Sequence, residues 1–491
     1  MSCSVLHHVE VCVKDNRFLH LLTKGFGFAP FAHRITSAST KLALRSGTSV
    51  FVVVKRNSEE NNQHGQNGTE ITKDVMNGCS NGYTNGTTEL ACESIYPRSS
   101  WLQSEREHWT VFCCEKTSRH IRDSVFNVAL TVKDIDTVTE RVKSHGGRVI
   151  KEPTEISDAE GRVRYSVVSS CLGNIVHTLI DKKHYKGTFL PGFESIEKHD
   201  EISIVLESIT NLFKKDSRTN TNGGCELLSK DNLKTQTPDF MVANCLKSPN
   251  SLNIPRSTFI DHVTYVCEIG KSSEILSWYE KCFGMKRFKT NKDESENEGF
   301  VLRENIGLRL KAMEYWRCAE TFLAAPDANN EDKSLKLVIA EPLPGVSTSH
   351  VQAFLKAHGG PGIQHIGLHT PTMVATVDFM AKNGVIFRKA PPVYYEEGIK
   401  LEEIQDAGHS EEVDLFKELG ILLDTEADAF SEDGDKQNNK SYLMQVFTGP
   451  LFDEDTFFLE VIQRKGAKGF GAGNIVALAK SIIIHNQKMN G

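Results

Sequence analysis

Leu6-His7-His8-Val9, near the start of the chain, matches Ile260-Asp261-His262-Val263 in its second half. The first stretch is followed by a helix-like segment and Gly25-Phe26-Gly27-Phe28, and the second by a helix-like segment and Cys282-Phe283-Gly284-Met285. Such self-similarity indicates a chain built from repeats, each of which is one unit of supersecondary structure. The spacing predicts that the unit consists of a strand, an amphipathic helix, a glycine turn and further strands.

A second pair of matching stretches extends the pattern. Val125-Phe126-Asn127-Val128-Ala129-Leu130 leads to a glycine pair at 146–147, and Ile363-Gln364-His365-Ile366-Gly367-Leu368 leads to Gly384. The chain therefore contains four units, paired into two halves. We predict an α+β fold of four tandem βαβββ modules, in which each half is an open barrel-like sheet with its helices outside.

Polar stretches separate these modules. They are rich in Asn, Gly, Thr, Ser and Lys, and cannot bury enough apolar surface to order themselves. We interpret four of them as loops or linkers: Asn57–Glu93, Lys214–Asn253, Glu314–Lys333 and Thr425–Lys440. The second joins the halves, so the predicted domains are 1–213 and 254–491, with the flexible linker 214–253 between them.

The composition is that of an ordinary globular protein. The 491 residues carry a formal net charge of −7 and no basic stripe, which argues against a nucleic-acid partner. The twelve cysteines form no CxxC pair, as expected of reduced intracellular thiols rather than of disulfides or a zinc site. No apolar run reaches the length of a transmembrane helix. A strand expected over Val5–Val13 leaves little room for a removable presequence.

Three strand-like runs of the second half each carry one side chain able to bind iron. They are Phe259-Ile260-Asp261-His262-Val263, Gly362-Ile363-Gln364-His365-Ile366 and Phe457-Phe458-Leu459-Glu460-Val461. A single His beside an apolar run is usually a packing residue, but a buried Glu without a partner is costly. Two imidazoles and one carboxylate are the donor set of the facial triad that holds non-haem Fe(II) with open positions. We therefore predict that His262, His365 and Glu460 bind a metal.

Strand alternation predicts which neighbours accompany these ligands. Ile260, His262 and Thr264 are expected on one face of their strand, because successive side chains point to opposite faces. His369 shares the face of His365, but four strand residues span roughly 13 Å. His369 is therefore interpreted as a structural histidine.

The corresponding positions of the first half lack this donor set. His8, Asn127 and Thr178 take the places of the two histidines and the glutamate. Only one of the three binds iron well. We predict that the N-terminal half has lost its metal and serves as a scaffold or an interface.

The segment Gly469-Phe470-Gly471-Ala472-Gly473-Asn474 superficially resembles a dinucleotide-binding loop. That fingerprint needs a βαβ unit and a later acidic residue, and too few residues follow it here. We interpret the segment as a flexible loop over the metal that leads into a terminal helix, Ile475–Ile484. This helix is predicted to gate the site and exclude water.

These motifs together resemble the 4-hydroxyphenylpyruvate dioxygenase family of the vicinal-oxygen-chelate superfamily. The resemblance rests on Phe458-Leu459-Glu460-Val461-Ile462-Gln463-Arg464, on the Gly469–Asn474 segment, and on Gly362-Ile363-Gln364-His365-Ile366 upstream. Thr448-Gly449-Pro450-Leu451-Phe452 and Phe189-Leu190-Pro191-Gly192-Phe193 are similar to the dioxygenase-like members of this family. The resemblance covers both halves outside the polar insertions.

The resemblance implies one Fe(II) per chain, held by His262, His365 and Glu460. It also implies that an aromatic α-keto acid, 4-hydroxyphenylpyruvate, reacts there with O2 by oxidative decarboxylation, with no separate 2-oxoglutarate. By the same resemblance, the residues expected to line the substrate pocket are Gln445, Phe447, Phe470 and Asn474. Gln364 matches as well, but alternation points it away from His365, so its role is expected to be indirect.

Four positions depart from the family pattern, one of which is Gly307, where the family has Ser. Ala340 stands where the family has Asn, His350 where it has Gln, and Ile475 where it has Phe. Replacing a Phe beside the substrate ring removes an aromatic contact worth about 0.5–1.5 kcal/mol. Loosening the ring favours attack at the benzylic carbon, and an aliphatic residue there resembles hydroxymandelate synthases. We therefore expect 4-hydroxymandelate as the product. The alternative is a different phenol-binding arrangement, with His350 as the new polar partner.

Several alternatives remain open. The chain could form homogentisate in tyrosine catabolism, cleave aromatic rings by extradiol chemistry, or be a non-catalytic scaffold of the same fold. The resemblance also suggests mitochondria, with the cytoplasm as the alternative, and a supply of 4-hydroxymandelate for the coenzyme Q headgroup. It further suggests a homo-oligomer assembled through the N-terminal half.

Overall fold

The computed structural model describes residues 6–36, 39–56, 123–196, 257–289, 294–303, 306–315, 335–346, 349–426 and 441–490. The predicted insertion 57–93 and linker 214–253 lie outside the described residues, as do most of the predicted loops 314–333 and 425–440. The predicted domain boundaries at 213 and 254 lie outside them too, so the division into domains stays a prediction.

The N-terminal half, residues 6–196, forms one nine-stranded sheet with the order β6-β7-β8-β5-β1-β4-β3-β2-β9. Its first module consists of β1 (Leu6–Cys12), α1 (Arg17–His20), η1 (Leu21–Gly25), β2 (Ala29–Ile35), β3 (Ser39–Ser46) and β4 (Ser49–Arg56). Its second module consists of β5 (Ser124–Thr131), α2 (Ile135–Ser144), β6 (Val149–Asp158), β7 (Gly161–Ser169) and β8 (Val176–Asp181), and β9 (Glu194–Ser195) lies at the edge.

The C-terminal half, residues 257–490, forms a second nine-stranded sheet with the order β11-β13-β14-β10-β15-β18-β17-β16, and β12 pairs with β13. Its first module consists of β10 (Phe259–Val266), α5 (Ser272–Phe283), β11 (Met285–Phe288), β12 (Phe300–Leu302), β13 (Leu308–Tyr315) and β14 (Lys336–Pro342). The helix α6 (His350–His358) leads to the second module.

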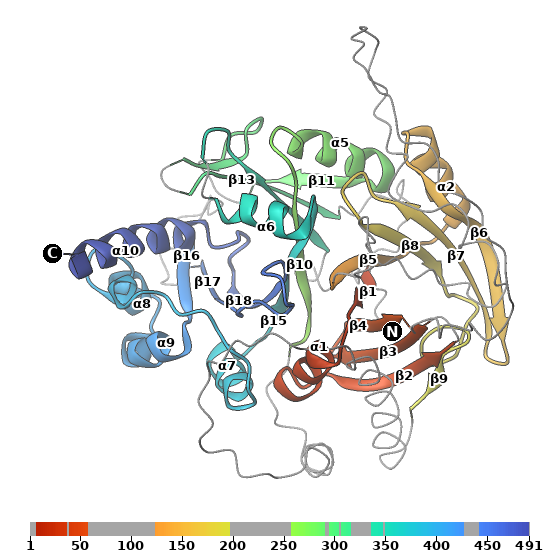
Figure 1. Cartoon of the computed structure of the whole chain (residues 1–491), viewed down its shortest axis with the longest axis horizontal. Helices are drawn as coiled ribbons and strands as arrows, with labels where there is room; N and C mark the ends of the chain where they lie inside the picture. Colours follow the sequence, from red (N-terminus) through yellow and green to blue (C-terminus); the bar gives the residue numbers. More distant parts are fainter. Residues whose placement is uncertain are drawn as a thin grey trace, which may run out of the picture.

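The last module carries extra helices before its final strands. It consists of β15 (Gly362–His369), α7 (Met373–Lys382), η5 (Pro392–Tyr395), α8 (Leu401–Asp406), η6 (Ser410–Glu412), α9 (Val413–Leu419), β16 (Leu422–Glu426), β17 (Ser441–Phe447) and β18 (Phe458–Lys465). The chain then continues into the helix α10 (Ala472–Asn490). Figure 1 shows α8, α9 and α10 together at the end of the molecule that lies farthest from the N-terminal half.

The two sheets have the same plan, which confirms the predicted α+β fold of four βαβββ modules. In each half the first strands of the two modules pair in antiparallel, β1 with β5 and β10 with β15. Each of these strands also pairs in parallel with the last strand of its own module. The result is two curled half-barrel sheets with helices on their outer sides (Figure 1).

One apolar core crosses from one half to the other. Its buried members include Val9 and Val128 on the first strands of the N-terminal modules, and Val263, Ile366 and Leu459 on the central strands of the C-terminal sheet. Full burial of a side chain of this size stabilises the fold by about 1.5–3 kcal/mol. The metal-free scaffold predicted for the N-terminal half is therefore packed against the strands that carry the predicted ligands.

A buried polar cluster also links the two halves. Nδ1 of His177 on β8 donates to the carbonyl of Val128 at 2.9 Å, so Nε2 is the acceptor for the hydroxyl of Tyr279 on α5, at 2.8 Å. The hydroxyl of Ser170 lies 2.9 Å from that of Tyr279. This arrangement needs a neutral imidazole, and burial lowers the pKa of His177 to about 4.

Three elements differ from their predicted ends. β13 and β16 continue to Tyr315 and Glu426, so each extends two residues into a predicted loop. The terminal helix begins at Ala472, three residues earlier than predicted, and ends at Asn490. Asp424 explains the early start, because its Oδ2 accepts a hydrogen bond from the backbone N–H of Gly473 at 2.9 Å. A carboxylate at this position satisfies a free N–H and interacts favourably with the helix dipole.

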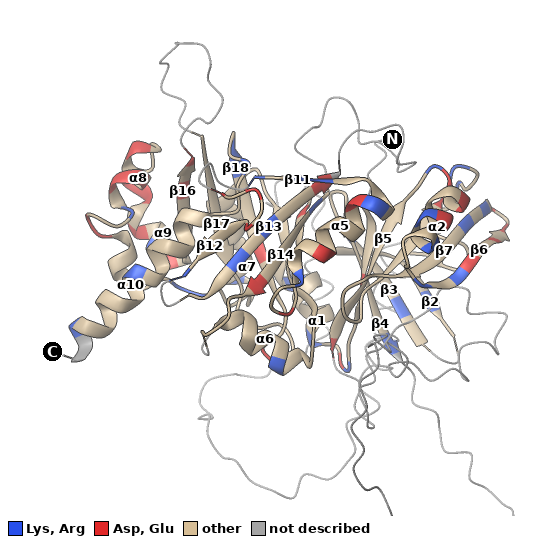
Figure 2. Cartoon of the chain, turned by 90° about the horizontal axis from the view of Figure 1, so that it is seen from above, with Lys and Arg blue, Asp and Glu red and all other residues tan. Residues whose placement is uncertain are grey.

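Charges of both signs are distributed over the surface. Figure 2 shows acidic residues on α8 and a mixture of acidic and basic residues over α2, β6 and β7. This mixture is consistent with the absence of a basic stripe in the sequence. Within the described ranges, every helix is too short or too polar to span a membrane.

The buried His177 predicts a pH dependence of stability. The unfolded chain binds a proton at this residue below about pH 6.5, whereas the folded chain resists protonation until about pH 4. The free energy of unfolding should therefore decrease as the pH is lowered from about 6.5 to about 4, by about 3 kcal/mol in total from this group. Urea unfolding at pH 7.5, 6.5, 5.5 and 4.5 measures the change. His177→Gln should lose less stability than the wild type over this interval, and parallel curves for the two proteins would contradict the assignment.

Candidate metal centre

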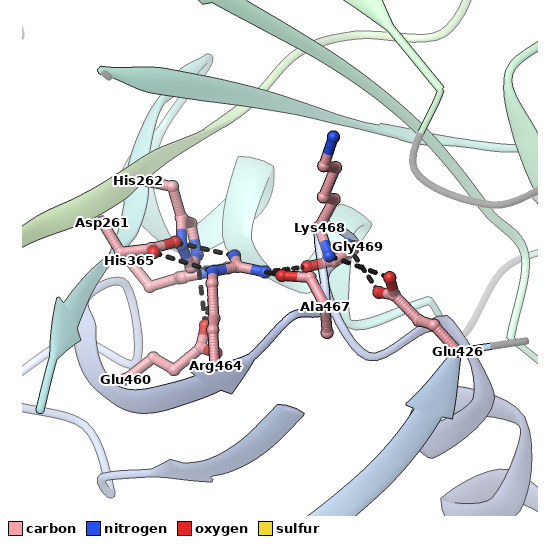
Figure 3. Close-up of polar contacts among 9 residues, drawn as sticks. All are labelled: Asp261, His262, His365, Glu426, Glu460, Arg464, Ala467, Lys468 and Gly469. Carbon is pink, nitrogen blue, oxygen red and sulfur yellow. Dashed lines mark hydrogen bonds and ion pairs between the residues drawn. The ribbon is translucent and has the colours of Figure 1, made fainter. Parts of the chain in front are cut away.

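The three predicted ligands lie on adjacent strands at the middle of the C-terminal sheet. In the pairing of β10 with β15 and of β15 with β18, His262 and Glu460 both lie opposite Gly367. His365 is two residues before Gly367 on β15, so its side chain points to the same face. Strand pairing alone thus brings three donors from distant parts of the chain to one place (Figure 3).

The donor atoms are close together and largely shielded from water. Nε2 of His262 lies 3.1 Å from Oε2 of Glu460, and Nε2 of His365 lies 3.6 Å from the same oxygen. One donor atom of each residue lies within 4.8 Å of the others, and the described residues contain this one such group of His, Cys, Asp or Glu. The exposed fraction of the side chain is 15% for His365 but 1% for His262, so solvent reaches the site beside His365.

β-Bulges precede both histidines. Asp261 and Gln364 lie outside the β10–β15 register, and such an extra residue changes the face to which the neighbouring side chains point. The prediction that Ile260 shares a face with His262 is wrong for this reason, since Ile260 packs in the main apolar core. The expectation that Gln364 points away from His365 is also wrong, because its Oε1 lies 3.4 Å from Nδ1 of His365.

A buried ion pair orients the ring of His262 (Figure 3). Nδ1 of His262 donates to Oδ1 of Asp261 at 2.9 Å, and Arg464 donates to both oxygens of Asp261, at 2.8 Å each. Burial would raise the pKa of Asp261, but the charge and hydrogen bonds of Arg464 hold it well below its usual range. Asp261 is therefore an anion that fixes the tautomer of His262 and leaves Nε2 free to face Glu460.

The two histidines differ in their electrostatic environment. Burial lowers the pKa of His365 well below its ordinary value, and the imidazoles of His262 and His350 lower it further. Burial also opposes protonation of His262, but the carboxylates of Glu460 and Asp261 outweigh it and raise the pKa. His262 thus faces two carboxylates, which favour a positive charge at this position. A divalent cation bound at Nε2 would supply that charge, since ligation needs a neutral imidazole.

Four predicted substrate-pocket residues are apolar and lie on this side of the sheet. The ring centroid of Phe470 lies 4.9 Å from that of His262, and the ring centroid of Phe447 lies 6.4 Å from that of His365. Phe470 and Ile475 pack in one apolar cluster with Ala340 on β14. The structure therefore brings these side chains together from the terminal segment, β17 and β14.

Two predicted pocket residues carry buried polar atoms. Gln445 on β17 and Asn474 on α10 are almost completely buried. The hydroxyl of Tyr394 donates to Oδ1 of Asn474 at 2.6 Å. Within the described residues, Oε1 of Gln445 and Nδ2 of Asn474 have no hydrogen-bond partner. Leaving such atoms unpaired is costly, so they mark positions where a polar ligand fits.

His350 has a different setting from the other predicted residues. It is the first residue of α6 and is exposed to solvent. The pKa of His350 is lowered, mainly because surrounding protein atoms desolvate the imidazole. The charge of Arg388 lowers this pKa further. The imidazole of His350 is one of the groups that lower the pKa of His365.

The N-terminal half repeats the bulges without the complete donor set. His7 and Phe126 lie outside the β1–β5 register, at the positions that match those of the C-terminal half. Nδ2 of Asn127 donates to Oγ1 of Thr178 at 2.8 Å, while His8 contacts a glutamate of its own strand. Two of the three side chains therefore satisfy each other with a hydrogen bond, and the third has a partner on its own strand.

Sequence reasoning did not identify four residues of this centre: Asp261, Gly367, Tyr394 and Arg464. An aspartate inside an apolar strand indicates a cationic partner. Nothing in the sequence, however, connects Asp261 with an arginine 203 positions away. The glycine opposite two ligands becomes meaningful only when the strand register is known.

Gly367 predicts a sensitive position for metal binding. A Cβ at this residue would lie 2.3 Å from Cε1 of the His262 ring. Gly367→Ala should therefore displace the imidazole and weaken Co(II) binding by about tenfold or more. Calorimetric titration of the purified protein measures the affinity. Gly449→Ala is the matched control, because its new Cβ would lie 3.8 Å from its nearest neighbour. Equal affinities of the two variants would contradict the role of Gly367.

The chain is similar to known proteins over most or nearly all of its length. It is 30% identical to the 4-hydroxyphenylpyruvate dioxygenase-like protein of Homo sapiens, over 98% of its own length and 95% of that protein. It is 29% identical to the Mus musculus protein of the same name, with the same coverage. It is also 28% identical to 4-hydroxyphenylpyruvate dioxygenase of Xenopus tropicalis, over 73% of its own length and 72% of that enzyme.

A solved structure has the same fold. A mutant of 4-hydroxymandelate synthase from Streptomyces coelicolor superposes with a TM-score of 0.56 over 98% of both chains, at 19% identity. No protein-family model matches the chain. The repeated modules, the three converging side chains and the similarity to these relatives over most of the chain lead to one conclusion. The chain belongs to the 4-hydroxyphenylpyruvate dioxygenase family.

Proposed function

We propose that this protein is a non-haem Fe(II) dioxygenase that converts 4-hydroxyphenylpyruvate and O2 to 4-hydroxymandelate and CO2. The observation that carries the proposal is the convergence of His262, His365 and Glu460, with one donor atom of each within 4.8 Å of the others. Membership of the dioxygenase family supports the substrate class and the use of O2.

The donor set fits Fe(II). Two imidazole nitrogens and one carboxylate oxygen from three strands leave several coordination positions open. The partial exposure of His365 supports access for a substrate from that side. Bound Fe(II) would supply the activation of O2, while the keto acid supplies the electrons as its carboxylate leaves as CO2. One oxygen atom of O2 then remains in the new carboxylate and the other in the new hydroxyl, so atoms and electrons balance.

Residues around the metal orient the keto acid. The unpaired Oε1 of Gln445 and Nδ2 of Asn474 offer one acceptor and one donor to its polar groups. Tyr394 holds the amide of Asn474 in one orientation by donating to Oδ1, so that the N–H group stays available. Phe447 and Phe470, beside the two histidines, provide aromatic walls and exclude water.

The choice of product depends on how the aromatic ring is held. Ile475 and Ala340, which replace larger family residues, pack in the same apolar cluster as Phe470. Without the aromatic contact, the ring is held less firmly by about 0.5–1.5 kcal/mol. About 1.4 kcal/mol changes the ratio of two competing rates tenfold. We propose that the looser ring directs oxygen to the benzylic carbon instead of the ring carbon that homogentisate formation requires.

The alternatives have less support. Homogentisate formation is favoured by the retained Gln445, Phe447, Phe470 and Asn474, but not by Ile475. A non-catalytic scaffold would have no need of three converging donors. We further propose a mitochondrial location, a supply of 4-hydroxymandelate for the coenzyme Q headgroup and assembly through the N-terminal half. All three rest on the family resemblance alone, and cell fractionation tests the first.

Product identification tests the proposed reaction. The purified protein is loaded with Fe(II) under argon, mixed with 4-hydroxyphenylpyruvate and exposed to O2. We expect 4-hydroxymandelate and no product from Glu460→Ala, which lacks the anionic ligand. The two candidate products are isomers of equal mass, so chromatography against standards must accompany mass spectrometry. Homogentisate as the main product would contradict the proposed reaction at the benzylic carbon.

Substitution of Ile475 tests the proposed basis of product choice. Ile475→Phe should restore an aromatic wall and raise the ratio of homogentisate to 4-hydroxymandelate by up to about tenfold. Ile475→Leu is the matched control, because it changes the shape of the side chain but not its aromatic character. An unchanged ratio in both variants would assign the product choice to another part of the pocket.

A further inference from the structure

One guanidinium group joins the metal ligand His262 to the segment that carries Phe470. Arg464 binds both carboxylate oxygens of Asp261 through Nε and Nη2, at 2.8 Å each. Its Nη1 donates in the opposite direction, to the carbonyls of Gly469 at 2.5 Å and Ala467 at 3.3 Å. In Figure 3 the guanidinium lies between the aspartate and these carbonyls.

The same segment is held from its other side by a second charge. The carboxylate of Glu426, the last residue of β16, accepts hydrogen bonds from the backbone N–H groups of Lys468 at 2.8 Å and Gly469 at 2.6 Å. Figure 3 places Glu426 on the far side of the segment from Arg464. The backbone next to Phe470 is therefore fixed between a cation and an anion.

The contacts close into a ring. Arg464 lies with its guanidinium carbon 5.1 Å from the centroid of Phe470, and the ring of Phe470 lies 4.9 Å from that of His262. His262 in turn is bonded to Asp261, which completes the path back to Arg464. A rotation of the His262 imidazole therefore disturbs both the ion pair and the packing of Phe470.

We propose that Arg464 is a positioning residue that couples metal binding at His262 to the ordering of the segment 467–471. The proposal rests on the metal centre of the proposed function. Binding fixes the ring of His262, which fixes Asp261 and the guanidinium, and the guanidinium holds the carbonyls beside Phe470. Because coupling between two equilibria is reciprocal, loosening the segment must weaken metal binding by the same factor. The substrate-facing Phe470 is thus set in place when the metal is bound.

A purely local role for Arg464 predicts a different dynamic behaviour of the segment 467–471. If Arg464 merely neutralises Asp261, the segment should have the same dynamics with and without metal. Glu426 distinguishes the two cases, because it contacts the segment but not Asp261 or His262. Its replacement should affect metal binding only if the segment and the metal are coupled.

Hydrogen exchange of the full chain measures the coupling directly. Metal-free protein and protein saturated with Co(II) are compared for peptides that cover 466–474. We expect Co(II) to slow exchange in this segment by about fivefold or more. If Co(II) binds and exchange in the segment is unchanged, the coupling is overturned while the metal centre stands. If Co(II) does not bind, the metal centre and the coupling are both overturned.

Two variants give the reciprocal test. Arg464→Lys keeps the charge but loses the forked geometry, and should bind Co(II) about 10–100-fold more weakly, with an altered visible spectrum. Glu426→Gln should bind Co(II) about fivefold more weakly and exchange faster in the segment. Arg164→Lys, which alters another forked pair with Asp136, is the matched control.

Circular dichroism must show that each variant is folded. If Arg464→Lys does not fold, the Co(II) affinity of Glu426→Gln alone tests the coupling. Wild-type Co(II) affinity in Glu426→Gln, together with faster exchange in its segment, would leave Arg464 with a local role and overturn the proposal.

Discussion

The pairing of β10, β15 and β18 is the constraint on which the rest of the centre depends. It buries the carboxylate of Glu460 between two imidazoles, at a position where an unpaired charge would be costly. A glycine between the ligands leaves room for the ring of His262, and an ion pair behind that ring holds it in one tautomer. The geometry of the candidate centre thus depends first on backbone register and only then on the identity of the side chains around it.

Much of this could be predicted from the sequence. Repeated strand motifs gave the four modules, and the donor residues could be recognised because each lay in an apolar, alternating run. The bulges at Asp261 and Gln364 could not be predicted, since alternation assumes an unbroken pleat. The early start of the terminal helix depends on Asp424, and the orientation of His262 depends on Arg464, both of which act across long sequence separations. Contacts of this kind leave no periodic signal in the sequence.

Comparison of the two halves separates what the fold requires from what the chemistry requires. The bulges occur at matching positions in both halves, although the N-terminal half has Asn127 and Thr178 where the C-terminal half has two of its donors. The bulges are therefore features of the module itself. The predicted ligands, the ion pair with Arg464 and the aromatic segment around Phe470 are additions to a backbone plan that the N-terminal half adopts without them.

The apolar core that crosses between the halves has a consequence for genetic variation in this protein. Because strands of both halves contribute to it, a substitution of a core residue in the N-terminal half is expected to lower the stability of the strands that carry the predicted ligands. A loss of about 1–2 kcal/mol is enough to change the cellular abundance of a protein several-fold. Damaging variants far from the metal should therefore act through the amount of folded protein, with normal chemistry in the molecules that remain. Such variants are candidates for rescue by compounds that stabilise the native state.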